Sequence, residues 1–85
     1  MTPYAVEWEE EPSNTLALAW LDPAQRAAVN AGSRELDRRL ARDPIGEGNH
    51  LSEGLYQIHA HPFTAFYTVD EDNRQVIVTD LWFNP

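Results

Sequence analysis

Large apolar and polar residues alternate at the start of the chain, where Tyr4, Val6 and Trp8 are separated by small or acidic residues. Side chains two positions apart point to the same face of an extended chain. The alternation therefore predicts a half-buried strand over residues 4–9.

The period then lengthens to that of a helix, with Leu16, Ala19 and Trp20 at positions i, i+3 and i+4. Pro12 suits the first turn of a helix, where its missing N–H group would have no partner. These signals predict a short helix over residues 12–21.

A second, longer helix is expected to start at residues 22–25. Asp22 can cap the helix, Pro23 can take its first position, and Gln25 can complete a capping box. The pair Asp43-Pro44 should end the helix, because a residue before proline avoids the α region. Its apolar stripe consists of Ala28, Val29, Leu36 and Leu40.

Two features inside this helix carry further expectations. Gly32 costs a helix up to about 1 kcal/mol relative to alanine, which suggests that a neighbouring backbone approaches closely there. Glu35 and Arg39 lie one turn apart, so we expect them to form a weak ion pair on the solvent side.

The second half of the chain has the signature of a sheet. Residues 45–54 contain three glycines and no period, which predicts a loop. Residues 55–61, 63–70 and 75–83 are rich in aromatic and β-branched residues and are separated by short turns, which predicts three antiparallel strands. The expected fold class is α+β: one domain over residues 1–85, with two N-terminal helices packed on an antiparallel sheet in the order β-α-α-β-β-β.

Charge and composition restrict the partners that the chain can have. It contains 14 acidic residues, six arginines and no lysine, which gives a formal net charge of -8. Such a surface repels polyphosphate and argues against direct nucleic-acid binding. Cysteine is absent, the apolar run 16–21 is too short to cross a membrane, and Met1-Thr2-Pro3 has no basic leader region. We therefore expect a cytoplasmic protein without membrane contact.

Several stretches follow the pattern of one known family. They are Tyr4-Ala5-Val6-Glu7-Trp8, the helix end Arg42-Asp43-Pro44, the loop Gly46-Glu47-Gly48-Asn49-His50, and the hairpin Phe66-Tyr67-Thr68-Val69-Asp70 leading into Val76-Ile77-Val78. Over nearly the whole chain they resemble the RelE/ParE toxin superfamily of type II toxin–antitoxin systems, which includes plasmid stabilisation proteins. The resemblance implies a toxin neutralised by an antitoxin segment that wraps its surface. RelE-type members are ribosome-dependent endoribonucleases that cut mRNA, whereas ParE-type members poison DNA gyrase.

The chain resembles a diverged member of this family. RelE-type members rely on lysines and arginines over the sheet, but here Tyr56 and Gln57 stand where an arginine is often found. Residues 63–67 lack the arginine that commonly precedes the aromatic residue, and residues 81–85 lack the usual basic or His-Tyr ending. These departures argue against RNA cleavage of the usual kind.

Four residues are nevertheless candidates for acid–base catalysis: Glu47, His50, His59 and His61. Cleavage by transesterification needs a base near the 2′-hydroxyl, an acid for the leaving oxygen and a cation on the phosphate. His59 and His61 share one face of a predicted strand, and Glu47 or His50 can approach from the loop. The alternatives are semi-exposed histidines without chemistry, or a weak metal-binding pattern that no carboxylate or cysteine completes. We therefore expect no metal and no cofactor.

Two further groups are candidates for partner binding. Arg34, Arg38 and Arg42 recur every four residues and form a positive stripe that can grip phosphate or an acidic antitoxin segment, or can simply be a solvated helix face. Trp82 and Phe83 end the last strand and can leave an apolar edge where an antitoxin segment or a second copy docks.

The sequence leaves three functions open. The first is a toxin-like component of a type II toxin–antitoxin system that acts by protein–protein contact without nuclease activity, with an antitoxin as partner and gyrase or the ribosome as a candidate target. The second is a ribosome-dependent mRNA endoribonuclease using Glu/His acid–base chemistry. The third is a small structural or regulatory homodimer with no catalytic role.

Overall fold

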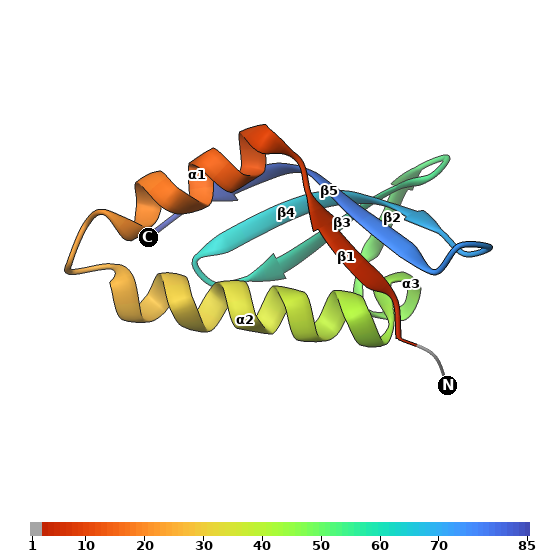
Figure 1. Ribbon diagram of the computed structural model, residues 1–85, viewed down its shortest axis with the longest axis horizontal. Helices are drawn as coiled ribbons and strands as arrows, with labels where there is room; N and C mark the ends of the chain where they lie inside the picture. The colour runs from red at the N-terminus through yellow and green to blue at the C-terminus, as the bar shows by residue number, and fades with distance from the viewer. Residues whose placement is uncertain (1–2) are drawn as a thin grey trace.

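A five-stranded sheet in the order β1-β5-β4-β3-β2 organises the computed structural model, which describes residues 3–85 (Figure 1). Strands β3 (Leu55–Ala60), β4 (Phe63–Asp70) and β5 (Gln75–Phe83) are consecutive antiparallel neighbours. Short strands form both edges: β1 (Ala5–Trp8) pairs in parallel with β5, and β2 (Asn49–Ser52) pairs antiparallel with β3. The α+β class is confirmed. Met1 and Thr2, on which the expected lack of a leader depends, lie outside the described residues.

Helices α1 (Glu10–Trp20) and α2 (Arg26–Arg42) run in opposite directions and are joined at one end (Figure 1). They cover the same side of the sheet, with β3 and β4 visible between them. Within residues 3–85, no helix combines the length and the apolar character that a membrane crossing needs.

The core lies between the two long helices and the three long strands, with α1 packed on β5. Alternate strand positions point toward the helix, as the pleat of a strand requires. The side chains at the centre of the core are Val29, Leu36 and Leu40 from α2, Ile58 from β3, Ala65 and Tyr67 from β4, and Val76 and Val78 from β5. Each of them is almost completely buried, so this contact holds the helix layer on the sheet.

The start of α2 differs from the prediction. The helix begins at Arg26, because the carboxylate of Asp22 accepts a hydrogen bond from the N–H of Ala24 and makes a local turn instead of a helix cap. Gln25 occupies the cap position without a side-chain hydrogen bond. The end of α2 at Arg42 agrees with the prediction, and α1 starts two residues earlier than predicted.

The loop predicted over residues 45–54 is wrong. It contains a one-turn helix α3 (Pro44–Glu47) and the edge strand β2. Asp43 caps α3 by accepting a hydrogen bond from the N–H of Gly46 at 3.0 Å. All four β2 residues are exposed, so the strand has no hydrophobic alternation by which the sequence could reveal it.

The exposed ion pair expected between Glu35 and Arg39 is also wrong. Glu35 accepts a hydrogen bond from Arg38 at 2.6 Å, three residues along the helix. Arg39 instead turns toward the sheet, where it bonds the carboxylate of Glu47 and the backbone oxygen of His59. A tertiary contact has replaced the local pair.

The close approach expected at Gly32 is confirmed. A Cβ atom on this glycine would lie 2.7 Å from the backbone oxygen of His61 and 2.9 Å from Cδ of Pro62. The turn between β3 and β4 therefore rests directly on the middle of α2. The glycine allows the backbones to approach at the cost of some helix propensity.

Gly32→Ala should lower the free energy of unfolding by about 1–3 kcal/mol, because the overlap with backbone at residue 61 outweighs a helix-propensity gain of up to about 1 kcal/mol. Urea denaturation followed by circular dichroism measures the change. Asn30→Ala, at an exposed site two residues earlier in the same helix, is the control and should not destabilise. A Gly32→Ala protein as stable as the parent would contradict the close contact.

Candidate functional site

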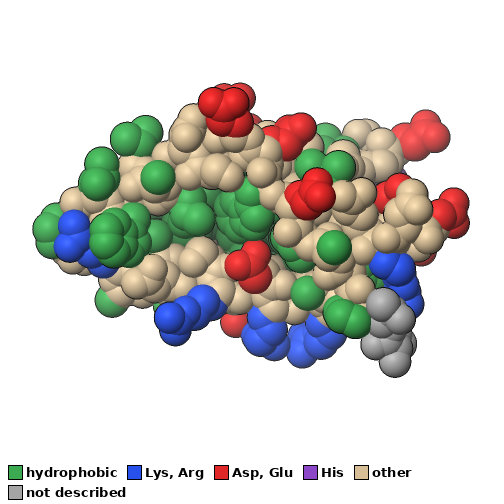
Figure 2. Space-filling view, in the orientation of Figure 1, with side chains coloured by type: hydrophobic (Ala, Val, Ile, Leu, Met, Phe, Trp, Pro, Cys, Tyr) green, Lys and Arg blue, Asp and Glu red, His purple; other side chains and the backbone are tan. Residues whose placement is uncertain are grey.

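An apolar groove lies between α1 and α2 on the helix side of the molecule (Figure 2). Its volume is about 400 Å³. The residues that line it are Ser13, Leu16, Ala17, Trp20 and Leu21 from α1 and its end, and Val29, Asn30 and Ser33 from α2. Most of this lining is apolar and reaches solvent, which is typical of a surface that binds another chain.

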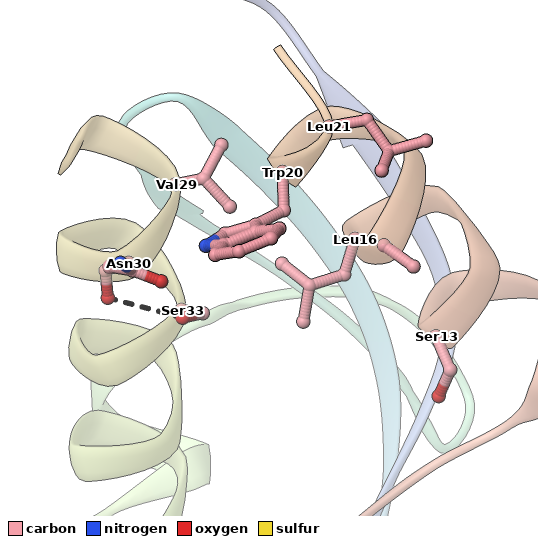
Figure 3. A pocket seen from close by; sticks show the side chains of 8 residues that line it. Ser13, Leu16, Trp20, Leu21, Val29, Asn30 and Ser33 are labelled. Carbon is pink, nitrogen blue, oxygen red and sulfur yellow. Dashed lines mark hydrogen bonds between the residues drawn. The ribbon is translucent and has the colours of Figure 1, made fainter. Parts of the chain in front are cut away.

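Trp20 is the largest side chain of this groove, and its ring projects into the space between the two helices (Figure 3). The guanidinium of Arg26 stacks on the ring at 4.2 Å from its centroid, while its Nε donates a hydrogen bond to the backbone oxygen of Trp20. Although 42% exposed, Trp20 is therefore held in place.

The other side of the sheet, which we call the open face, carries the strand residues that alternate with the core. These are Leu55, Gln57 and His59 on β3, Thr64, Phe66 and Thr68 on β4, Ile77, Asp80 and Trp82 on β5, and Ala5 and Glu7 on β1. Trp82 and Phe66 are cross-strand neighbours with ring centroids 5.4 Å apart. An aromatic pair, and not a cluster of cations, occupies the centre of this face.

The arginines lie elsewhere. Five of the six are in α2, and the sixth, Arg74, follows β4 in the hairpin turn, where its guanidinium stacks on Tyr4 at 4.8 Å. Arg38 and Arg42 of the predicted stripe each bond an acidic residue, Glu35 and Glu47 respectively. In Figure 2 several basic side chains follow the outer edge of α2, and others lie at the two ends of the molecule.

The candidate acid–base residues are divided between different environments. His59 and His61 line one small pocket with Thr64 and Asn84, and the Nδ1 atom of His59 shares a 2.8 Å hydrogen bond with the Thr64 hydroxyl. His50 lies in β2, with its ring edge-on to Tyr56 at 5.2 Å. No group of three acidic, histidine or cysteine side chains suited to a metal occurs within residues 3–85.

Glu47 is bound by arginines of α2. Arg39 and Arg42 both donate hydrogen bonds to its carboxylate, and Arg39 also reaches the backbone oxygen of His59 at 2.8 Å. The hydrogen bond and the charge of Arg42, with the charge of Arg39, hold the pKa of Glu47 below its usual range against a smaller opposing effect of desolvation. Ionised at neutral pH, this carboxylate fastens α3 to α2.

Tyr67 supports the same region from the core. Its hydroxyl donates a 2.6 Å hydrogen bond to the backbone oxygen of Pro44, and burial raises the pKa of its phenol to about 12. The ring also stacks with Tyr56 at 5.7 Å. By donating this hydrogen bond, the neutral phenol fixes the start of α3, which is a structural role.

Comparison of the coordinates with solved structures identifies a close match in shape. A chain in the crystal structure of the toxin–antitoxin complex RelBE2 from Mycobacterium tuberculosis superposes with a TM-score of 0.74. The match covers 96% of this chain and 99% of that chain, at 22% sequence identity. The chain has the fold of the RelE/ParE toxins. At this identity the RelE/ParE similarity concerns the fold, since one fold can carry different activities.

Two other comparisons find nothing. No protein-family model matches the sequence, and no curated protein matches it. The similarity is thus found in the fold and not in the sequence.

Lowering the pH should selectively weaken the contact between α3 and α2. The pKa of Glu47 in the folded state is below the usual 4.5. The stability that its ionised carboxylate adds is therefore fully present above pH 4.5, and it is lost as the pH falls through the folded-state pKa. The difference in unfolding free energy between the parent and Glu47→Gln should therefore shrink between pH 7 and pH 3. Glu53→Gln, at an exposed turn between β2 and β3, is the matched control. A difference that is constant over this range would contradict the Arg–Glu contact.

Proposed function

We propose that the chain is the toxin-like component of a type II toxin–antitoxin system and that it acts by protein–protein contact in the cytoplasm. The observation that carries this proposal is the composition of the open face. Among the described residues of that face there is an aromatic pair, Phe66 and Trp82, and no arginine or lysine. The RelE/ParE fold supplies the general context.

Electrostatics favours protein contact over RNA cleavage. A cut phosphodiester develops negative charge that a nuclease stabilises with preorganised cations. Here Asp80 and Glu7 add negative charge to the open face, while Arg39 and Arg42 are bound to Glu47. DNA gyrase or a ribosomal protein is accordingly the proposed kind of target, in place of an RNA substrate.

Neutralisation by an antitoxin is the second part of the proposal. The structural neighbour comes from a toxin–antitoxin complex. In this chain, the groove between α1 and α2 has room for the apolar face of an amphipathic helix, with Trp20 as its main contact. Of the stripe Arg34, Arg38 and Arg42, an acidic part of the same antitoxin can contact Arg34, because Arg38 and Arg42 are engaged by Glu35 and Glu47. We therefore assign an antitoxin helix to this groove.

Expression of the chain alone should arrest bacterial growth, and a co-encoded antitoxin should relieve the arrest.

Leu21→Asp should weaken antitoxin binding at least about tenfold, because it places a charge in an apolar groove. Isothermal titration calorimetry measures the affinity. Leu18→Asp is the matched control. Leu18 in α1 is 69% exposed and Leu21, directly after α1, is 63% exposed, but only Leu21 lines the groove.

Two results would contradict this assignment. Equal loss of affinity in the Leu18 and Leu21 variants would remove the groove as the antitoxin site. Unaffected growth, together with no partner encoded beside the gene, would remove the toxin–antitoxin role and favour a structural or regulatory homodimer.

One observation supports a nuclease as second candidate, namely the pair of His59 with the Thr64 hydroxyl beside His61. We expect mRNA in a translation extract to stay intact in the presence of the chain. If mRNA is cut, and replacement of both His59 and His61 by alanine stops the cutting, the acid–base mechanism holds and the protein-contact proposal fails.

A further inference from the structure

We infer that the open face of the sheet is a docking surface for a cationic protein segment, whose arginine or lysine stacks on Trp82 beside the carboxylate of Asp80. Calling this segment part of the toxin's target rests on the proposed function. The binding of a cationic segment does not depend on the proposed function.

Trp82 is exposed and yet fixed. It is 56% exposed, with one side of its indole against Phe66. Its Nε1–H donates a 3.1 Å hydrogen bond to Oδ2 of Asp80. A rigid exposed tryptophan loses little conformational entropy when a partner covers it, which is why such residues dominate the energy of protein interfaces.

Charge selects the partner. Asp80 accepts from the indole with one oxygen and from the backbone N–H of Leu81 with the other, at 2.9 Å, and each oxygen keeps free acceptor capacity. Glu7 reaches the same face from β1, because Glu7 pairs with Ile77 while Trp8 donates a hydrogen bond to Asp37 on the helix side. Tryptophan is the aromatic side chain that attracts a cation most strongly, and the adjacent carboxylate of Asp80 reinforces that attraction. Glu7 adds negative charge farther along the same face.

Anionic partners and a second copy fit this face less well. The described residues of the open face offer no arginine or lysine to an RNA backbone. A second copy placed face to face would bring Asp80 and Glu7 of one chain toward the same residues of the other, and like charges in an interface are unfavourable. The open face thus favours a segment of opposite charge.

The test uses the full chain labelled with ¹⁵N and follows the indole N–H signals of its three tryptophans by NMR. The probe is a short acetylated and amidated peptide of alternating arginine and valine. We expect a saturable shift of the Trp82 signal, with the Trp8 and Trp20 signals unchanged as internal controls. A peptide of alternating glutamate and valine should produce no shift.

Variants separate the aromatic from the charge contribution. Trp82→Ala, followed through the backbone amides of β5, should weaken peptide binding at least about fivefold. Asp80→Asn retains an oxygen acceptor for the indole but removes the charge, and should weaken binding about threefold. Glu11→Gln removes the same charge from an exposed site on α1 and should leave the affinity unchanged. The dispersion of the amide signals verifies that each variant is folded.

Several outcomes would overturn the inference: no saturable shift with the arginine peptide, equal shifts with both peptides, or a Trp82 shift produced by a single-stranded RNA oligonucleotide instead. Sedimentation showing a dimer that Trp82→Ala dissociates would assign the face to a second copy and overturn it as well. Because the titration needs neither an antitoxin nor a toxic phenotype, its failure is distinguishable from failure of the proposed function. In cells, Trp82→Ala should abolish growth arrest while retaining antitoxin binding.

Discussion

The contact between the helix layer and the three long strands is the interaction on which the remaining structure depends. Among the described residues both long helices lie on one face of the sheet, and nearly all of the buried strand side chains belong to that face. Leu36 and Leu40 are completely buried in that layer, and Gly32 lets the β3–β4 turn rest on the helix backbone. The open face and the groove between α1 and α2 are both consequences of this one-sided packing.

One-sided packing also separates the charges. With five of the six arginines in α2, positive charge stays with the helix layer, where Arg39 and Arg42 hold Glu47 and thereby α3. The open face carries Asp80 and Glu7, and among the described residues of that face there is no arginine or lysine to balance them. The open face is therefore an acidic and aromatic surface, which is why we favour a protein partner.

The accuracy of the sequence prediction followed the strength of the local signal. Strands β4 and β5 have the predicted bounds, since their apolar residues alternate and their turns are short. The end of α2 was predicted from Asp43-Pro44, whereas its start was not, because Asp22 makes a turn with Ala24. The prediction missed α3, which is a single turn, and β2, whose four residues are all exposed. Tyr67 and Arg39 hold α3 in place, and pairing with β3 holds β2.

By itself the sequence determined the fold class, the apolar stripe of α2, the close approach at Gly32 and the shortage of cations beyond α2, since each depends on residue type and spacing along the chain. Only the tertiary structure decided which residues meet. It placed β1 beside the first half of β5, so that the edge predicted for that strand is partly covered, and it joined Arg39 to Glu47 in place of Glu35. It also opened a groove at Trp20 and set Trp82 against Phe66 and Asp80. Such contacts join residues distant in sequence, and no local period encodes them.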